Sequence, residues 1–99
     1  MEIVKFAVMN DSDFERIKNT LDQTHDWPSV FLFKFIVPSE SDKIARVEAL
    51  FNSETAEIRM RESRNGKYTS ISAREAMTSA ESVLECYQKA SEIEGLIAL

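Results

Sequence analysis

The sequence predicts an α+β fold whose elements follow the order β-α-β-β-α-β over residues 27–99, as a single domain. Two kinds of pattern follow each other along the chain. In some stretches apolar and polar residues alternate, which is typical of strands, and in others apolar residues recur every three or four positions, which is typical of helices. Between two of the alternating stretches stands Asn65-Gly66, the dipeptide that most strongly indicates a tight β-hairpin.

Residues 1–26 are predicted to be an N-terminal extension with one amphipathic helix. Ser12 and Glu15 have the spacing of a capping box, in which each side chain bonds a backbone N–H at the helix start. The helix continues to about Thr24. Its narrow apolar stripe consists of Phe14, Ile17 and Leu21. The apolar residues within 3–8 form either a short strand that joins a sheet edge or a loosely held tail.

Val30 to Val37 is the most apolar of the expected strands. Both of its faces are mostly apolar, which predicts a central position in the sheet. Pro38 ends the strand, and Ser39 to Asp42 form a turn and helix cap. A helix of about eleven residues, ending near Asn52, should follow. Its apolar positions are Ile44, Val47, Leu50 and Phe51.

The strands Ala56–Ser63 and Tyr68–Ala73 flank Asn65-Gly66 and should form a hairpin. We expect a two-residue turn in which both residues have positive φ. This turn sets the register and places apolar residues opposite apolar residues. The predicted pairs are Ile58 with Ala73, Met60 with Ile71, Arg59 with Ser72, Arg61 with Ser70 and Ser63 with Tyr68.

Thr78 and Glu81 again have capping-box spacing and should begin the second helix of the domain. Its apolar residues are Ala80, Val83, Leu84, Tyr87 and Ala90. Gly95 should end it, and Leu96 to Leu99 should form the last strand. Right-handed crossovers then give an antiparallel sheet of order 4-1-3-2 with both helices on one face, the ferredoxin-like fold. The face toward the helices should carry Phe31, Phe33, Phe35, Ile58, Met60 and Ile71.

Three segments resemble the YbeD-like family of small uncharacterised bacterial proteins: WPSVFLFKFIVP at 27–38, ESRNGKYTSIS at 62–72 and IEGLIAL at 93–99. The resemblance implies the same β-α-β-β-α-β core, which is similar to the ligand-sensing ACT regulatory domains, and it implies no established activity. Many relatives have glycine where this chain has Pro38. Amino-acid-binding ACT domains tend to use glycine in that loop, and its absence from residues 38–42 argues against amino-acid sensing.

No arrangement of reactive residues is visible in the sequence. His25 and Cys86 belong to different elements, and Cys86 has the helical spacing of a half-buried core residue. The glycines, Gly66 and Gly95, do not form a phosphate-binding loop. The carboxylates are distributed along helix surfaces. We therefore expect a non-enzymatic protein with no catalytic residue, no cofactor and no metal site.

The stretch from Ala56 to Arg74 is basic, although the chain as a whole is acidic. By the hairpin register, Arg59 and Arg61 share the helix-free sheet face with apolar residues of the first strand. The residues expected on this candidate interaction face are Leu32, Lys34, Ile36, Arg59, Arg61, Tyr68 and Ser70. Two interpretations remain open, ordinary solvated charges or a docking face. The N-terminal helix, a second copy or a partner would cover its apolar part.

These features favour a small regulatory or protein-interaction module that binds a protein partner, or a second copy of itself, through the open sheet face or an edge strand. The alternative is an ACT-like domain that senses a small molecule. RNA binding through Arg59, Arg61 and Tyr68 is least favoured, because the chain is acidic and Ser70 stands where an RNA-recognition motif has a second aromatic residue.

Overall fold

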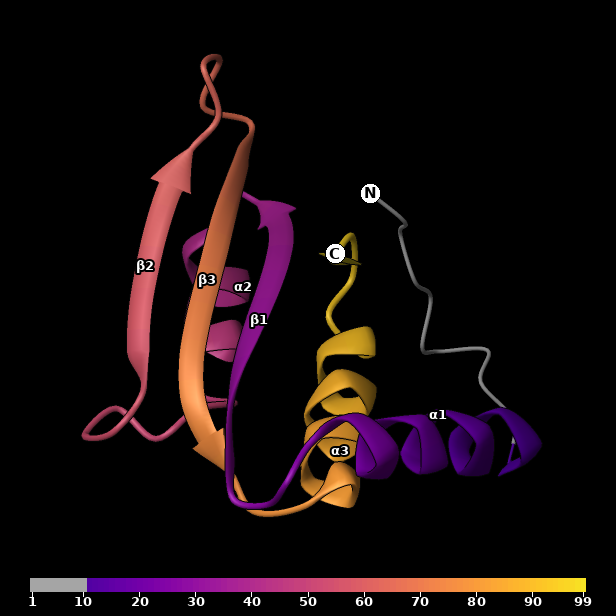
Figure 1. Cartoon of the computed structure of the whole chain (residues 1–99). Coiled ribbons are helices and arrows are strands. Elements are labelled where there is room, and N and C mark those ends of the chain that lie inside the picture. Colours follow the sequence, from indigo (N-terminus) through magenta and orange to yellow (C-terminus); the bar gives the residue numbers. More distant parts are fainter. Residues whose placement is uncertain (1–10) are drawn as a thin grey trace.

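The computed structural model describes residues 11–99, so the segment expected to add a strand or tail at 3–8 lies outside the described residues. The seven elements follow one another as shown in Figure 1. They are α1 (Asp11–Thr24), β1 (Ser29–Pro38), α2 (Ser41–Glu48), β2 (Glu57–Glu62), β3 (Tyr68–Met77), α3 (Ala80–Ser91) and β4 (Ile97–Ala98). The α+β class predicted from the sequence is confirmed.

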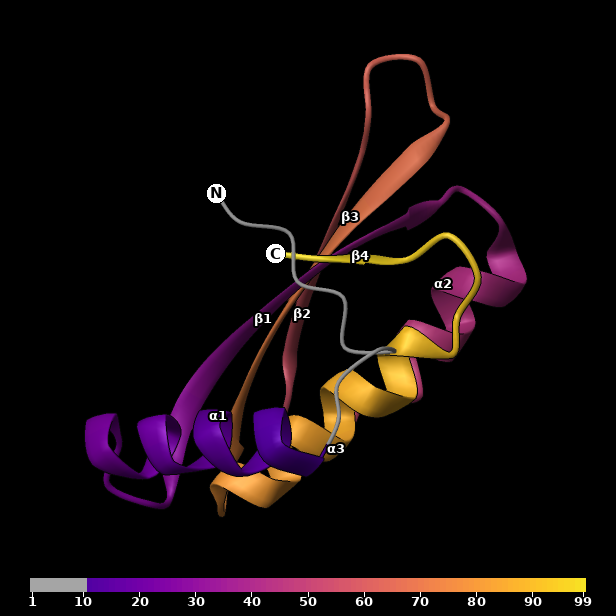
Figure 2. The ribbon, with the colours of Figure 1, turned by 90° about the vertical axis from the view of Figure 1, so that its right-hand side faces the viewer.

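The strands form one open antiparallel sheet in the order β2-β3-β1-β4, which is 4-1-3-2 counted from the other edge. In Figure 1 helix α2 lies behind the sheet and α3 lies to the right of β1, and the side view in Figure 2 shows both helices on the same side of the sheet. The arrangement is broadly ferredoxin-like. In detail, β4 is shorter than expected and pairs with β1 only at Phe35 and Ile36.

The three helices begin or end at other residues than the sequence predicts. Helix α1 already includes Ser12, so that residue does not cap it. Helix α2 ends at Glu48 instead of near Asn52, because the chain tightens into turns that bury Phe51 against the core. The capping box of α3 is formed by Ser79 and Ser82, not by Thr78 and Glu81. The Ser82 amide donates to Ser79 Oγ at 3.1 Å, and the Ser79 amide donates to Ser82 Oγ at 3.3 Å.

The β2–β3 hairpin has the predicted register, with Ile58 opposite Ala73 and Met60 opposite Ile71. The turn differs from the prediction, because Asn65 does not have positive φ and only Gly66 does, at 72°. The Asn65 side chain explains the difference. Its Oδ1 accepts hydrogen bonds from the Lys67 amide at 3.0 Å and from the Ser63 hydroxyl at 2.9 Å, which stabilises a wider loop.

The core lies between the sheet and helices α2 and α3. Its largest fully buried side chains are Phe33, Phe35, Val37, Val47, Ile71, Val83 and Leu84. The rings of Phe31, Phe51 and Tyr87 pack around Phe33 and Phe35, with centroid separations between 4.8 and 6.4 Å. Met60, expected to face the helices and hold the fold, is 43% exposed, because it lies on edge strand β2.

Helix α1 packs on α3 at one end of the sheet (Figure 2). Lys18 Nζ lies 3.2 Å from Glu81 Oε1, and Leu21 packs against the core. The connection to β1 is held by Trp27, whose indole Nε1 donates to Asp22 at 2.9 Å. None of the helices within residues 11–99 is both long and apolar enough to span a membrane.

Candidate interaction face

All seven residues expected on the open face lie on that side of the sheet, because the ladders of β1, β3 and β2 align them in rows. One row places Lys34 beside Ser72 and Arg59. The next places Ile36 beside Ser70 and Arg61. Leu32 and Tyr68 complete the set from β1 and β3.

The apolar part of the face remains accessible in the described chain. Val30 is 62% exposed, Leu32 45% and Tyr68 46%, whereas Ile36 is partly buried. Helix α1 does not cover these side chains, since it packs on α3 (Figure 2). Of the three covers considered from the sequence, the N-terminal helix within residues 11–24 is therefore not the one observed.

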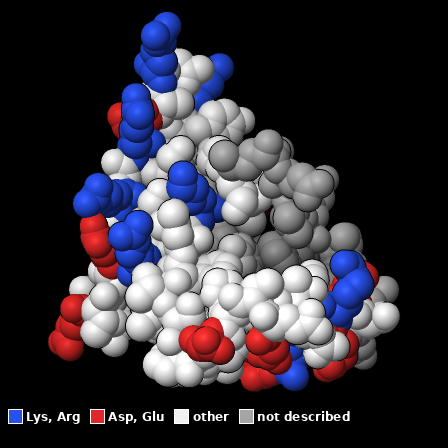
Figure 3. Space-filling view, in the orientation of Figure 1, with Lys and Arg blue, Asp and Glu red and all other residues white. Residues whose placement is uncertain are grey.

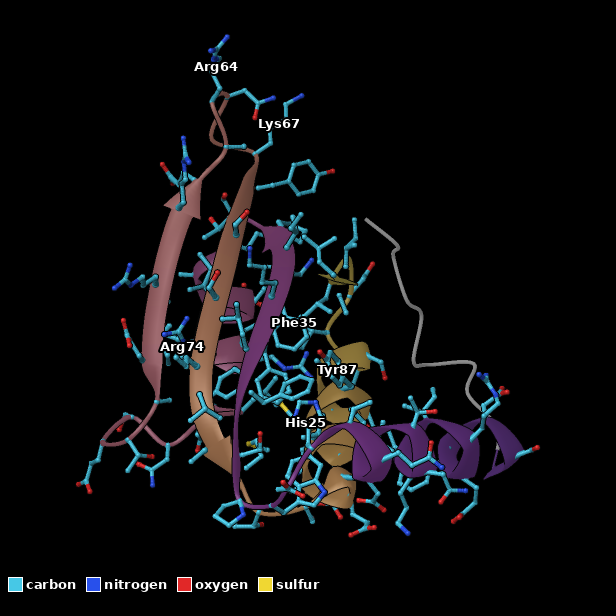
Figure 4. The ribbon with its side chains drawn as sticks, viewed as in Figure 1. His25, Phe35, Arg64, Lys67, Arg74 and Tyr87 are labelled. Carbon is cyan, nitrogen blue, oxygen red and sulfur yellow. The ribbon has the colours of Figure 1, made fainter. Side chains whose placement is uncertain are left out.

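Lys and Arg side chains gather over β2, β3 and the hairpin, and acidic side chains lie over α1 in the same view (Figure 3). Arg59 Nη2 is 2.8 Å from Glu57 Oε1. The other cations of this region have no carboxylate within 4.0 Å among residues 11–99; they are Lys34, Arg61, Arg64, Lys67 and Arg74. Arg64 and Lys67 project from the tip of the hairpin, and Arg74 lies farther along β3, away from that tip (Figure 4).

Two hollows lie among these charges. One, of about 230 Å³, is lined by Leu32, Glu57, Arg59, Ser72 and Arg74. The other, of about 530 Å³, lies near the hairpin and is lined by Arg61, Glu62, Ser63, Arg64 and Ser70. The face is therefore not flat, and both hollows carry guanidinium groups.

The alternation of the strands already placed Val30 and Ser72 on this face, but sequence reasoning did not include Glu57 and Arg74 in the candidate site. The strand prediction stopped at Ala73, whereas β3 continues to Met77 beside β1. Extending the hairpin register by one pair would have placed Glu57 opposite Arg74, as the structure does. The register therefore contained the information, but the charged residues Arg74 and Glu75 interrupt the apolar alternation that indicated the strand.

The side chains of Cys86 and His25 are both held by packing or polar contacts within the fold. Cys86 is 7% exposed, and burial, with a smaller effect of the Glu75 carboxylate, raises the pKa of its thiol to about 12. A thiol with this pKa stays protonated and is a poor nucleophile. Ring stacking on Trp27 and a 3.1 Å contact between Nδ1 and the Ser29 hydroxyl hold His25 in place. Within residues 11–99, no group of three His, Cys, Asp or Glu residues is placed to hold a metal ion.

Comparison with known proteins gives one result. A family model described as "Protein of unknown function (DUF493)" matches residues 22–99, from the end of α1 through β4. No curated protein and no solved structure matches the chain. The matched segment contains the whole sheet, α2 and α3, and every residue of the candidate interaction face. The chain therefore belongs to the DUF493 family of proteins of unknown function.

Proposed function

We propose that this protein is a non-enzymatic regulatory module that binds an acidic surface of another protein on the open face of its sheet. The observation that carries the proposal is the group of unpaired cations beside exposed Leu32 and Val30, on a chain whose net charge is −5. Apolar groups supply binding free energy when they are desolvated, and charges around them steer association and select the partner. We also propose a cytoplasmic location, because the sequence has a single cysteine, Cys86, and therefore no internal disulfide, which is what a reducing compartment favours.

The positive charge of the open face also indicates whether it binds a different protein or a second copy of this chain. A two-fold symmetric dimer through this face would bring the same cations together, because both subunits use the same patch in such an interface. Like charges across an interface disfavour association. A different protein with an acidic surface is therefore the better complement, and a symmetric dimer through this face is disfavoured.

The test uses a photoreactive amino acid in place of Leu32, with crosslinking in native cells and mass spectrometry to identify what is captured. The affinity of the purified partner is then measured for a double charge reversal, Arg59→Glu with Arg61→Glu. The matched control reverses Arg46 and Lys89, exposed residues in the last turns of α2 and α3, and changes net charge equally. Thermal unfolding of each variant confirms that it is folded.

We expect the reversal on the face to weaken binding at least about tenfold and the control by less than about threefold. The proposal fails if the two double variants lose the same affinity. It also fails if no partner is captured reproducibly from position 32 while the protein is monomeric.

A second candidate is the sensing of a small molecule, which the YbeD-like and ACT-like resemblance suggests. The hollow of about 230 Å³ favours it, since that volume suits a small metabolite. The loop after β1 does not favour it, because Ser39 is already held by the neighbouring chain. The Ser39 backbone N–H donates a hydrogen bond to the Lys67 carbonyl at 2.9 Å, just before β3, and the Ser39 hydroxyl lies 2.8 Å from the Thr69 hydroxyl in β3. A thermal-shift screen of small anions decides this, since a ligand at a hundred times its Kd adds about 2.7 kcal/mol of stability.

A further inference from the structure

The hollow lined by Leu32, Glu57, Arg59, Ser72 and Arg74 has the chemistry of a carboxylate-binding site. We infer that it receives a carboxylate group, with Arg74 as the main anchor. This inference rests on the proposed function, because the carboxylate is taken to belong to an Asp or Glu side chain of the docked partner protein. The same chemistry is available from a free small carboxylic acid, and the experiment below separates the two sources.

The pairing of charges leaves Arg74 available. Glu57 lies directly opposite Arg74 in the β2–β3 ladder, yet its carboxylate is bonded to Arg59 at 2.8 Å. Arg74 is exposed and has no carboxylate within ion-pairing distance in the part of the chain that the structure describes. A guanidinium group has five N–H donors in a planar fork that matches a carboxylate. A carboxylate that enters the hollow therefore meets an unoccupied fork.

Two other side chains of the hollow favour the same ligand. The Ser72 hydroxyl makes no hydrogen bond within residues 11–99 and adds a neutral O–H donor. Leu32 lies opposite Arg74 on the β1 side and forms an apolar wall. Arg64 and Lys67, at the hairpin tip, are not among the residues that line this hollow (Figure 4).

Glu57 restricts the charge of the ligand. Its carboxylate is part of the lining, so a group with two negative charges, such as a phosphate monoester, is repelled more strongly than a carboxylate. Glu57 also occupies Arg59, and it therefore competes with the ligand for one of the two guanidinium groups. Removing its charge should strengthen carboxylate binding, and this prediction distinguishes the hollow from the rest of the basic surface.

The experiment is a titration of the ¹⁵N-labelled protein followed by the side-chain Nε–Hε signals of its arginines. The probes are a blocked hexaglutamate peptide, sodium glutarate and inorganic phosphate, at constant ionic strength. The variants are Arg74→Gln in the hollow and Arg64→Gln as the matched control, since Arg64 is also exposed and unpaired but lies outside the hollow. Glu57→Gln is the third variant.

We expect hexaglutamate to shift the Arg74 signal most and Arg74→Gln to weaken binding about fivefold. Arg64→Gln should weaken it by less than about twofold, and Glu57→Gln should tighten it about threefold. The inference is overturned if Arg74→Gln and Arg64→Gln have equal effects, or if phosphate displaces the peptide at a lower concentration than glutarate does. If either result is found and a partner still crosslinks from position 32, only the carboxylate site is disproved and the proposed function stands.

Two results together would assign the carboxylate to a free small acid. Glutarate would shift the Arg74 signal at a lower concentration than hexaglutamate does, and no partner would be captured by crosslinking. That outcome supports the carboxylate site and removes the proposed docking of a protein. The failure of one proposal is thus distinguishable from the failure of the other.

Discussion

Gly95 lies so close to Pro38 that a β-carbon on Gly95 would be 2.9 Å from Cγ of the proline ring. Gly95 also has φ of 82°, in the region that side chains with a β-carbon avoid. Pro38 ends β1, and Gly95 lies in the turn between α3 and β4. The contact therefore fixes how the chain returns from α3 to the edge of β1, and glycine is required there for two independent reasons.

The variant Gly95→Ala should lower the free energy of unfolding by about 2–4 kcal/mol, the sum of left-handed strain and steric overlap. Gly66→Ala is the matched control, because Gly66 has φ of 72° but no atom within 4 Å of the added β-carbon. It should cost about 1–2 kcal/mol from the backbone alone. Urea unfolding measures both. Equal losses of unfolding free energy in the two variants would show that Pro38 moves aside without an energetic penalty.

The sequence predicted those features of the fold that depend on side-chain periodicity. The alternation of Ile58 and Met60 with charged residues fixed the hairpin register, because a shift by one residue would bury the arginines. Features that depend on a local choice between similar residues were missed. Ser79 and Thr78 are both good caps, and the sequence does not show which of them has the extended backbone that a cap needs.

The candidate face was predictable to the extent that the strands were. The register placed Arg59 and Arg61 on one face, and the structure places them there. Arg74 was missed because it follows Ala73, after which the apolar alternation fades. The pairing of Glu57 with Arg59 instead of Arg74 depends on side-chain conformation, which the pattern of the sequence does not contain.

Phe33→Ala should lower the free energy of unfolding by about 3–5 kcal/mol, because Phe33 is fully buried and its ring packs against those of Phe31, Phe51 and Tyr87. Val30→Ala, in the same strand but 62% exposed, should change it by less than about 0.5 kcal/mol. Chemical denaturation with circular dichroism measures both. A large loss at Val30 would mean that the open face is covered in the folded protein.

Alkaline pH should destabilise the protein through Cys86 and Tyr87. Burial raises the pKa of each group to about 12, from ordinary values of 9.0 and 10.0. Between these values the unfolded chain releases protons that the folded chain retains, so stability is complete below about pH 9 and falls as the pH rises toward 12. Unfolding free energies measured from pH 7 to 11 should show this fall, with a shallower slope for Cys86→Ala. An unchanged slope would contradict the role of the thiol.

Leu21 should hold helix α1 on the domain more strongly than Lys18 does. Leu21 packs against the core, and its replacement by alanine should lower the stability of the α1 docking by about 1–2 kcal/mol. The Lys18–Glu81 pair, although it raises the pKa of Lys18, lies in solvent and should contribute little. Amide hydrogen exchange within residues 12–24 reports the docking directly, because a loosened helix exchanges faster while β1 and β3 remain protected. Faster exchange in Lys18→Ala than in Leu21→Ala would reverse this assignment.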